Sequence, residues 1–200
     1  MNTYTIKKAD ERCDWSVAET LSIDNALWVA DVGIQSYGQF LWDESGIYVH
    51  LWAREKNIRA EGRGPLSMVC EDSCLEFFFQ PVEYDARYFS FEINPNGAFL
   101  YAFQIDRLNA VRLKLDDYDK SLNAVVEKTE DGWDAKYKIP IKLIQLIFPG
   151  YGFKSGMVIR ANCFKCGDKT VNPHYYSWNK VEMDYPDFHK HEYFGRMILA

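Results

Sequence analysis

Apolar and polar residues alternate along several short segments of the chain with a period of two. In residues 47–54 the odd positions hold Ile, Val, Leu and Ala, while the even positions hold Tyr, His, Trp and Arg. Such alternation predicts a strand with one face on a core. Residues 39–42 precede it, and the intervening Asp43-Glu44-Ser45-Gly46 supplies turn residues, so the two segments predict a β-hairpin.

Similar segments recur at short intervals along the rest of the chain. Residues 75–79 resemble a buried strand, and single strands are expected at 158–164, 174–178 and 194–199. Two more hairpins are expected, where residues 88–94 and 98–103 flank Asn-Pro-Asn-Gly and where residues 123–130 and 133–139 flank Asp-Gly. Many short strands with turns between them predict a β-sandwich, with a barrel as the alternative, rather than a βαβ fold.

Helical signals are weak. Residues 141–148 can form one or two helical turns before Pro149 and Gly150 end them. No linker, internal repeat or low-complexity run divides the 200 residues, a comfortable length for one core. The expectation is therefore a single all-β domain over residues 1–200.

Composition and charge exclude several function classes. Hydrophobic residues make up 48% and charged residues 26%, which is typical of a folded globular chain. The net charge of −6 comes without a basic stripe, which excludes a typical nucleic-acid partner. No apolar run is long enough to span a membrane, and residues 1–8 lack the apolar core of a signal peptide. We therefore expect a cytoplasmic protein with no membrane partner.

The cysteines offer a possible metal or redox site. The chain has five, at Cys13, Cys70, Cys74, Cys163 and Cys166. Cys163-Phe-Lys-Cys166 has the spacing of a zinc knuckle, and Cys70 and Cys74 can supply two more thiolates. However, cysteines three apart on a strand start on opposite faces. The spacing therefore favours free thiols and no zinc.

Two carboxylates and a group of histidines offer other chemistry. Asp72 and Glu76 are four residues apart on a predicted strand, hence on one face, which suggests a glycosidase pair or, more simply, contacts to a hydroxyl, a cation or an arginine. No second acidic pair stands out. A histidine and a methionine can ligate haem axially, but loop histidines facing solvent are the simpler interpretation of the set His174, His189 and His191, with Met183 and Met197 nearby.

Aromatic residues are abundant, at 16% of the chain. Five tryptophans lie on or beside predicted strands, and most of them are expected in the core or in cross-strand packing: Trp28, Trp42, Trp52, Trp133 and Trp178. One or two exposed rings would suffice as a platform for the C–H face of a sugar. The sequence does not separate platform from core.

Six motifs occur in an order that resembles the family 9 carbohydrate-binding modules, in particular their stand-alone bacterial branch. They are EDSCLEFFF (71–79), YFSFEINPNG (88–97), RANCFKC (160–166), SWN (177–179), PDFH (186–189) and YFG (193–195). The resemblance covers about residues 15–199. It implies an immunoglobulin-like antiparallel β-sandwich. It also implies structural cations, possibly Ca²⁺, whose ligands we cannot place in this sequence.

The resemblance also implies a binding site. Characterised modules of the family, attached to xylanases, clamp the reducing end of a glucan or xylan between two tryptophans, and polar side chains bind the hydroxyls. The acidic contact matches Glu76, a polar contact matches Arg160 with Asn162 two residues on, and the second clamp position falls at Phe188. The first clamp position falls among residues 68–70, where there is no tryptophan, and Phe89 stands where the family has an arginine.

These observations predict non-catalytic binding of the end of a glucan- or xylan-type oligosaccharide, associated with carbohydrate catabolism and, in the cell, with a partner glycosidase. The candidate carbohydrate-binding residues are Glu76, Arg160, Asn162, Phe188, His189 and Trp178. Three alternatives stay open: a glycoside hydrolase or an accessory part of one, a haem-binding cytochrome-like sandwich, and a domain that kept the fold and lost the ligand.

Overall fold

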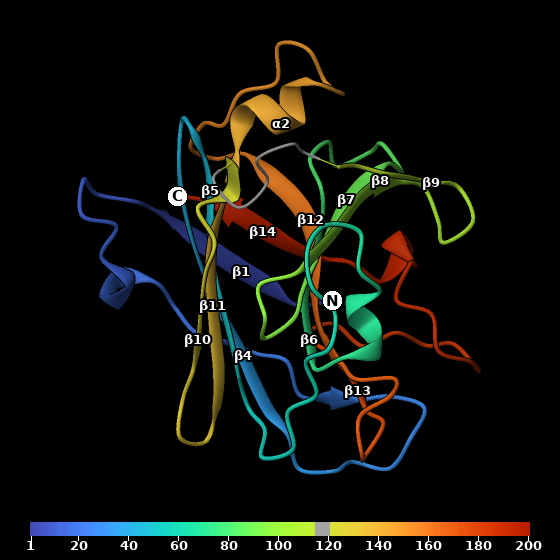
Figure 1. The fold of residues 1–200 in the computed structure, drawn as a ribbon. Helices are drawn as coiled ribbons and strands as arrows, with labels where there is room; N and C mark the ends of the chain where they lie inside the picture. Colours follow the sequence, from blue (N-terminus) through green and yellow to red (C-terminus); the bar gives the residue numbers. More distant parts are fainter. Residues whose placement is uncertain (115–120) are drawn as a thin grey trace.

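The computed structural model describes residues 1–114 and 121–200, which form two sheets joined into one curled sheet (Figure 1). Sheet A consists of β14 (Gly195–Leu199), β12 (Val158–Cys166), β6 (Cys74–Gln80), β7 (Tyr88–Ile93), β8 (Phe99–Gln104) and β9 (Ala110–Arg112), with β13 (Tyr175–Ser177) and β3 (Asn25–Ala26) beside β12. Sheet B consists of β10 (Val125–Lys128), β11 (Gly132–Pro140), β5 (Gly46–Arg54), β4 (Gln35–Asp43) and β2 (Leu21–Ser22). The all-β prediction is confirmed.

The first strand, β1 (Thr3–Lys8), joins the two sheets. Its first part pairs with β14 and its last two residues pair with β4, in both cases in parallel. The sandwich is therefore antiparallel except at this strand. Parallel strands are distant in sequence and are not joined by a hairpin turn. The period-two pattern and the turn residues therefore do not indicate which strands pair in parallel.

The three predicted hairpins are present with small changes of boundary. β4 and β5 pair from Gln35 and Arg54 to the turn, so the hairpin is longer than the pattern indicates. β7 pairs with β8, and β10 with β11. The helical segments are short: η1 (Trp15–Val17), η2 (Val69–Glu71), α2 (Ile141–Gln145) and η3 (His191–Tyr193). Within the described residues, no helix is long and apolar enough to cross a membrane.

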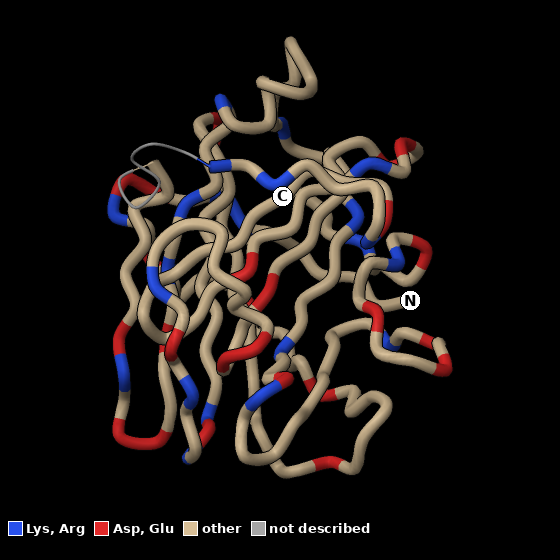
Figure 2. The backbone as a smooth tube through the Cα atoms, turned by 45° about the vertical axis from the view of Figure 1, so that its right-hand side comes forward, with Lys and Arg blue, Asp and Glu red and all other residues tan. Residues whose placement is uncertain are grey.

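The main core lies between the two sheets. Strand alternation sends one set of side chains from sheet A, among them Phe77, Phe91 and Cys163, to meet side chains of sheet B such as Phe40 and Val49. The rings of Phe40 and Phe77 lie 4.7 Å apart. Along the described backbone, the positions of Lys and Arg are interspersed with those of Asp and Glu and do not gather on one side (Figure 2).

The opposite face of sheet A carries a second, smaller cluster. It includes Cys74, Phe78, Phe164 and Cys166, covered by residues of the loops such as Phe188. The loops before β4, around η2 and after β13 therefore do not lie free in solvent but pack on this face. The space that they leave open over the sheet is the candidate site.

Candidate functional site

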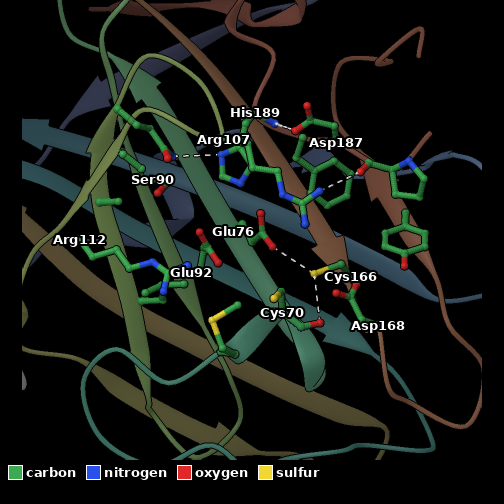
Figure 3. Close-up of a pocket in the computed structure, with 18 of the residues that line it drawn as sticks. Cys70, Glu76, Ser90, Glu92, Arg107, Arg112, Cys166, Asp168, Asp187 and His189 are labelled. Atoms are coloured by element: carbon green, nitrogen blue, oxygen red, sulfur yellow. Dashed lines mark hydrogen bonds between the residues drawn. The ribbon is translucent and has the colours of Figure 1, made fainter. Parts of the chain in front are cut away.

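A cavity of about 390 Å³ lies on the face of sheet A turned away from the main core. Its floor is formed by side chains from neighbouring strands: Glu76 of β6, Ser90 and Glu92 of β7, Leu100, Ala102 and Gln104 of β8, Arg112 of β9 and Cys166 of β12. Its walls come from the loops and include Trp28, Arg107, Asp168 and the segment from Pro186 to His189 (Figure 3). The volume falls in the range of small-molecule sites.

Register, not sequence proximity, brings the two floor glutamates together. Glu76 and Glu92 are directly opposite each other in the antiparallel pair β6–β7, so their side chains leave the sheet on the same face (Figure 3). Both are almost fully buried. Burial raises the pKa of Glu76 to about 7, and burial together with the neighbouring Glu76 raises the pKa of Glu92 well above its ordinary value.

Cationic side chains lie at the edge of this acidic floor. Arg112 acts electrostatically on Glu92 and lowers the pKa of that carboxyl against the effect of burial. Arg107, in the loop between β8 and β9, reaches across to the Pro186 carbonyl at 3.5 Å. Asp168 faces the same space, and burial raises its pKa. The cavity therefore offers fixed hydrogen-bond acceptors and donors side by side.

Aromatic rings form one wall. Phe188 stacks on Phe164 with ring centroids 4.2 Å apart, and Trp28 and Tyr175 pack around it at 5.4 and 6.1 Å. Phe188 is only 8% exposed, whereas Trp28 and Tyr175 are half-buried and keep ring surface accessible. These two rings therefore give the wall its accessible aromatic surface.

The backbone at Trp28 is unusual. Its φ of 60° lies in the left-handed region, which a bulky residue rarely adopts. The ring is held by a hydrogen bond from its Nε1 to the Met183 carbonyl, 2.7 Å away. Strained backbone that holds a ring against a cavity is typical of binding sites.

His189 is held as a neutral ring. Its Nδ1 lies 3.1 Å from the Gln104 amide nitrogen, which can only donate, and 3.3 Å from the Tyr88 hydroxyl. The ring proton is then on Nε2, where it can donate. Burial lowers the pKa of His189 to about 4, in agreement with a neutral ring.

Comparison with known sequences decides the family. The sequence profile of carbohydrate-binding family 9 matches residues 7–199, almost the whole chain. The chain belongs to carbohydrate-binding family 9. No curated protein matches the chain.

Solved structures share the family 9 fold seen here. One, from Bacteroides uniformis and provisionally assigned as a carbohydrate-binding protein, is 22% identical, with 99% of each chain covered and a TM-score of 0.84. A family 9 module of Caldicellulosiruptor kristjanssonii in complex with cellotriose is 11% identical, with 99% of this chain and 93% of that chain covered and a TM-score of 0.67. The same module in complex with glucose is 11% identical, with 100% of this chain and 96% of that chain covered and a TM-score of 0.68. At these identities the likeness establishes the fold.

The structure brings three of the predicted site residues together. Glu76, Phe188 and His189 all line the cavity. The segment 185–189 is a loop, as predicted, but Phe188 is packed rather than exposed. The role of all three in sugar binding stays a prediction for this family 9 protein.

Two further candidates lie on the same face of β12 as Cys166, but they do not line the cavity. The Arg160 Nη2 donates to the backbone carbonyls of Phe194 and Glu192. Asn162 is buried, donates to the Asn179 carbonyl and accepts from the Asn179 amide. The C-terminal loops cover this half of the strand, and strand parity alone does not reveal that cover.

The remaining candidate, Trp178, lies in the main core between the sheets. It is 6% exposed and meets the ring of Tyr4 edge-on. Its position beside β13 turns it away from the cavity.

Two interpretations of individual motifs are wrong. Asp72 does not share a strand with Glu76, because it caps η2 and accepts hydrogen bonds from the Glu61 and Gly62 amides. His174 does not face solvent: it is 1% exposed, and its Nε2 lies 2.6 Å from the Lys165 Nζ. Both side chains serve the packing of loops rather than the cavity.

The site residues missed from sequence include Trp28, Tyr175, Glu92, Arg112 and Asp168. Glu92 lies between Phe91 and Ile93, so a glutamate in this largely apolar strand is a usable signal. Trp28 and Asp168 come from loops, where no periodicity applies.

One set of metal-ligating side chain types lies close together in the described part of the chain. Cys74, Glu76 and Cys166 place their ligand atoms within 4.8 Å of one another. Two thiols do not suit Ca²⁺, which takes six to eight oxygen ligands. This set therefore does not fit the calcium that the family resemblance implies.

Proposed function

We propose that the cavity binds the end of a glucan- or xylan-type oligosaccharide without cleaving it. The observation that carries the proposal is the combination of accessible rings on one wall with carboxylates and a guanidinium on the floor. A pyranose ring presents a C–H face that stacks on aromatic rings, and its hydroxyls both donate and accept. Family membership and the glucose and cellotriose complexes of the related module support a glucan-type ligand.

Each group of lining residues has a defined part in this proposal. Trp28 and Tyr175 supply the stacking surface. Glu76 and Glu92 accept hydrogen bonds from hydroxyls, and Arg112 and the His189 Nε2 donate to them. A volume near 390 Å³ suits the end of a chain rather than an extended polymer.

The arrangement of the glutamates favours binding over hydrolysis. Glycosidase carboxyls flank the scissile bond from two sides. Glu76 and Glu92 instead leave neighbouring strands side by side and approach a ligand from one direction. A hydrolase alternative is nevertheless tested directly, by following the release of reducing sugar in the same samples.

Calorimetric titration with cellotriose, xylotriose and borohydride-reduced cellotriose tests the proposal. Binding of cellotriose and loss of binding after reduction would identify the reducing end as the recognised group. Trp28→Ala should weaken binding about fivefold or more, since loss of an aromatic side chain that anchors a ligand costs about 1 kcal/mol or more. Trp52→Ala is the matched control, because Trp52 stacks on Tyr37 on the outer face of sheet B.

Two results would contradict the proposal. One is the absence of binding to all three sugars by folded protein. The other is equal affinity in wild type and Trp28→Ala, which would place the sugar elsewhere.

A further inference from the structure

The strongest further observation is a group of two thiols and one carboxylate at the cavity floor, in which the carboxylate, Glu76, is also a proposed saccharide contact. Cys74 and Cys166 are directly opposite each other in the antiparallel pair β6–β12. Glu76 follows Cys74 by two residues, so its side chain leaves β6 on the same face. All three side chains are buried, with exposed fractions of 0%, 3% and 2% for Cys74, Glu76 and Cys166.

Distances within the group match those between ligands of one metal ion. The Glu76 Oε1 lies 3.1 Å from the Cys166 Sγ and 3.7 Å from the Cys74 Sγ. With zinc–sulfur bonds of about 2.3 Å and zinc–oxygen bonds of about 2.0 Å, tetrahedral geometry puts sulfur and oxygen about 3.5 Å apart. The observed pair of distances brackets that value.

We propose that Cys74, Glu76 and Cys166 bind a thiophilic divalent cation of the Zn²⁺ type at the floor of the cavity. Two thiolates and one carboxylate are a ligand set for zinc, and three protein ligands leave one position free. Glu76 and Cys166 line the cavity, so water or a ligand oxygen can complete the coordination from that side.

The surroundings favour a cation over an uncharged arrangement. Glu92 faces Glu76 across the strand pair, and Asp168 lines the same cavity. These carboxyls attract a divalent cation bound to the three ligands, and the cation in turn favours their ionised form. The ligands come from two paired strands rather than from loops, which fixes their spacing before an ion arrives.

The proposed site differs from the zinc knuckle considered for Cys163 and Cys166. Cys163 points into the main core and Cys166 into the second cluster, so these two thiols lie on opposite faces of β12, as the spacing predicts. The partner of Cys166 is instead Cys74, 92 positions earlier in the chain, which strand register brings opposite. The site thus uses only Cys166 of the CxxC motif, and it shares Glu76 with the proposed sugar contacts.

Titration of the reduced, full-length protein with Co²⁺, followed by displacement with Zn²⁺, tests the proposal. We expect one ion per chain and a thiolate-to-cobalt charge-transfer band in the near ultraviolet. Cys74→Ala and Cys166→Ala should each weaken binding by more than about 100-fold, since even outer-shell changes cost 10–100-fold. Glu76→Gln should weaken binding while the charge-transfer band remains.

Cys163→Ala is the matched control, because Cys163 is equally buried on the same strand and faces away from the group. It should bind Co²⁺ like the wild type. The proposal is overturned if folded wild type gives no charge-transfer band, or if the band survives in the Cys74→Ala/Cys166→Ala double variant. Because the first measurement uses wild type alone, misfolding of a variant cannot obscure the result.

Discussion

Two groups of ionisable side chains lie on opposite faces of sheet A, and they are built differently. On the core side, Lys165 is fully buried, with its Nζ 3.2 Å from the Glu55 Oε2, 2.6 Å from the His174 Nε2 and 2.9 Å from the Cys166 carbonyl. Ser73 also donates to Glu55. On the cavity side, Glu76, Glu92 and Asp168 gather with Arg112 as a neighbouring cation.

The difference separates a structural group from a binding one. In the Lys165 group the cation, the carboxylate and the imidazole satisfy one another, and no polar partner remains to be supplied from outside. In the cavity the carboxylates outnumber the cations, and burial holds the pKa of all three above its ordinary value. Carboxyls that are gathered in a cavity with raised pKa values are typical of binding and active sites.

The largest effect should follow from breaking the core-side group. Lys165→Met leaves the Glu55 carboxylate buried without its cation, which should lower the free energy of unfolding by about 3–5 kcal/mol. Urea unfolding at neutral pH measures the loss. Glu55→Gln in the same chain should recover part of the loss, since it removes the unpaired charge.

The matching change on the cavity side sharpens the contrast. Glu92→Gln removes one of two facing carboxyls and should leave the free energy of unfolding unchanged or raise it. A loss as large as that of Lys165→Met would mean that the two groups do not differ in the way described.

Phe188→Ala should have the next largest effect. The ring is stacked on Phe164 and nearly enclosed, so its removal should lower the free energy of unfolding by about 3 kcal/mol. Tyr185→Ala, in the same loop but 55% exposed, should change stability by less than about 0.5 kcal/mol. If chemical denaturation finds Phe188→Ala as stable as Tyr185→Ala, the ring is a surface platform and not part of the packing.

His189 should make the cavity side sensitive to acid. Because burial depresses its pKa to about 4 in the folded state, the unfolded chain binds more protons between pH 6.5 and 4. Stability from this residue is therefore present above pH 6.5 and falls as the pH drops, by about 2–3 kcal/mol at pH 4.5. His189→Gln keeps an acceptor for Tyr88 and Gln104, and its urea midpoint should fall less than that of wild type between pH 7.5 and 4.5. If the urea midpoints of wild type and His189→Gln fall equally with pH, His189 is not the cause of the acid sensitivity.

The sequence predicts the fold better than the site for a physical reason. Strand alternation is local, so the hairpin of residues 39–53 and the buried strand 75–79 are visible in the pattern. The family resemblance then supplies the sandwich. A turn signal such as Asp131-Gly132 adds the register of one neighbouring pair.

The site depends on relations that no local pattern contains. Glu92 meets Glu76, and Cys74 meets Cys166, through the register of strands that are distant in sequence. The family resemblance matched Arg160 to a polar sugar contact by its place in the sequence alone. It could not show that the chain around residue 194 would cover that position.

The smallest expected effect concerns Arg160 and tests whether the C-terminal loop around residue 194 keeps it away from the sugar. The guanidinium is engaged with the Phe194 and Glu192 carbonyls, away from the cavity, so Arg160→Ala should leave the affinity for cellotriose unchanged. Gln104→Ala removes a cavity side chain that also positions His189, and it should reduce the binding free energy of cellotriose by about 1–2 kcal/mol. Calorimetric titration of both variants with cellotriose shows which of the two side chains contributes to the affinity. A loss of affinity in Arg160→Ala equal to that in Gln104→Ala would mean that the C-terminal loop opens when sugar binds and that the site extends along β12 beyond the cavity.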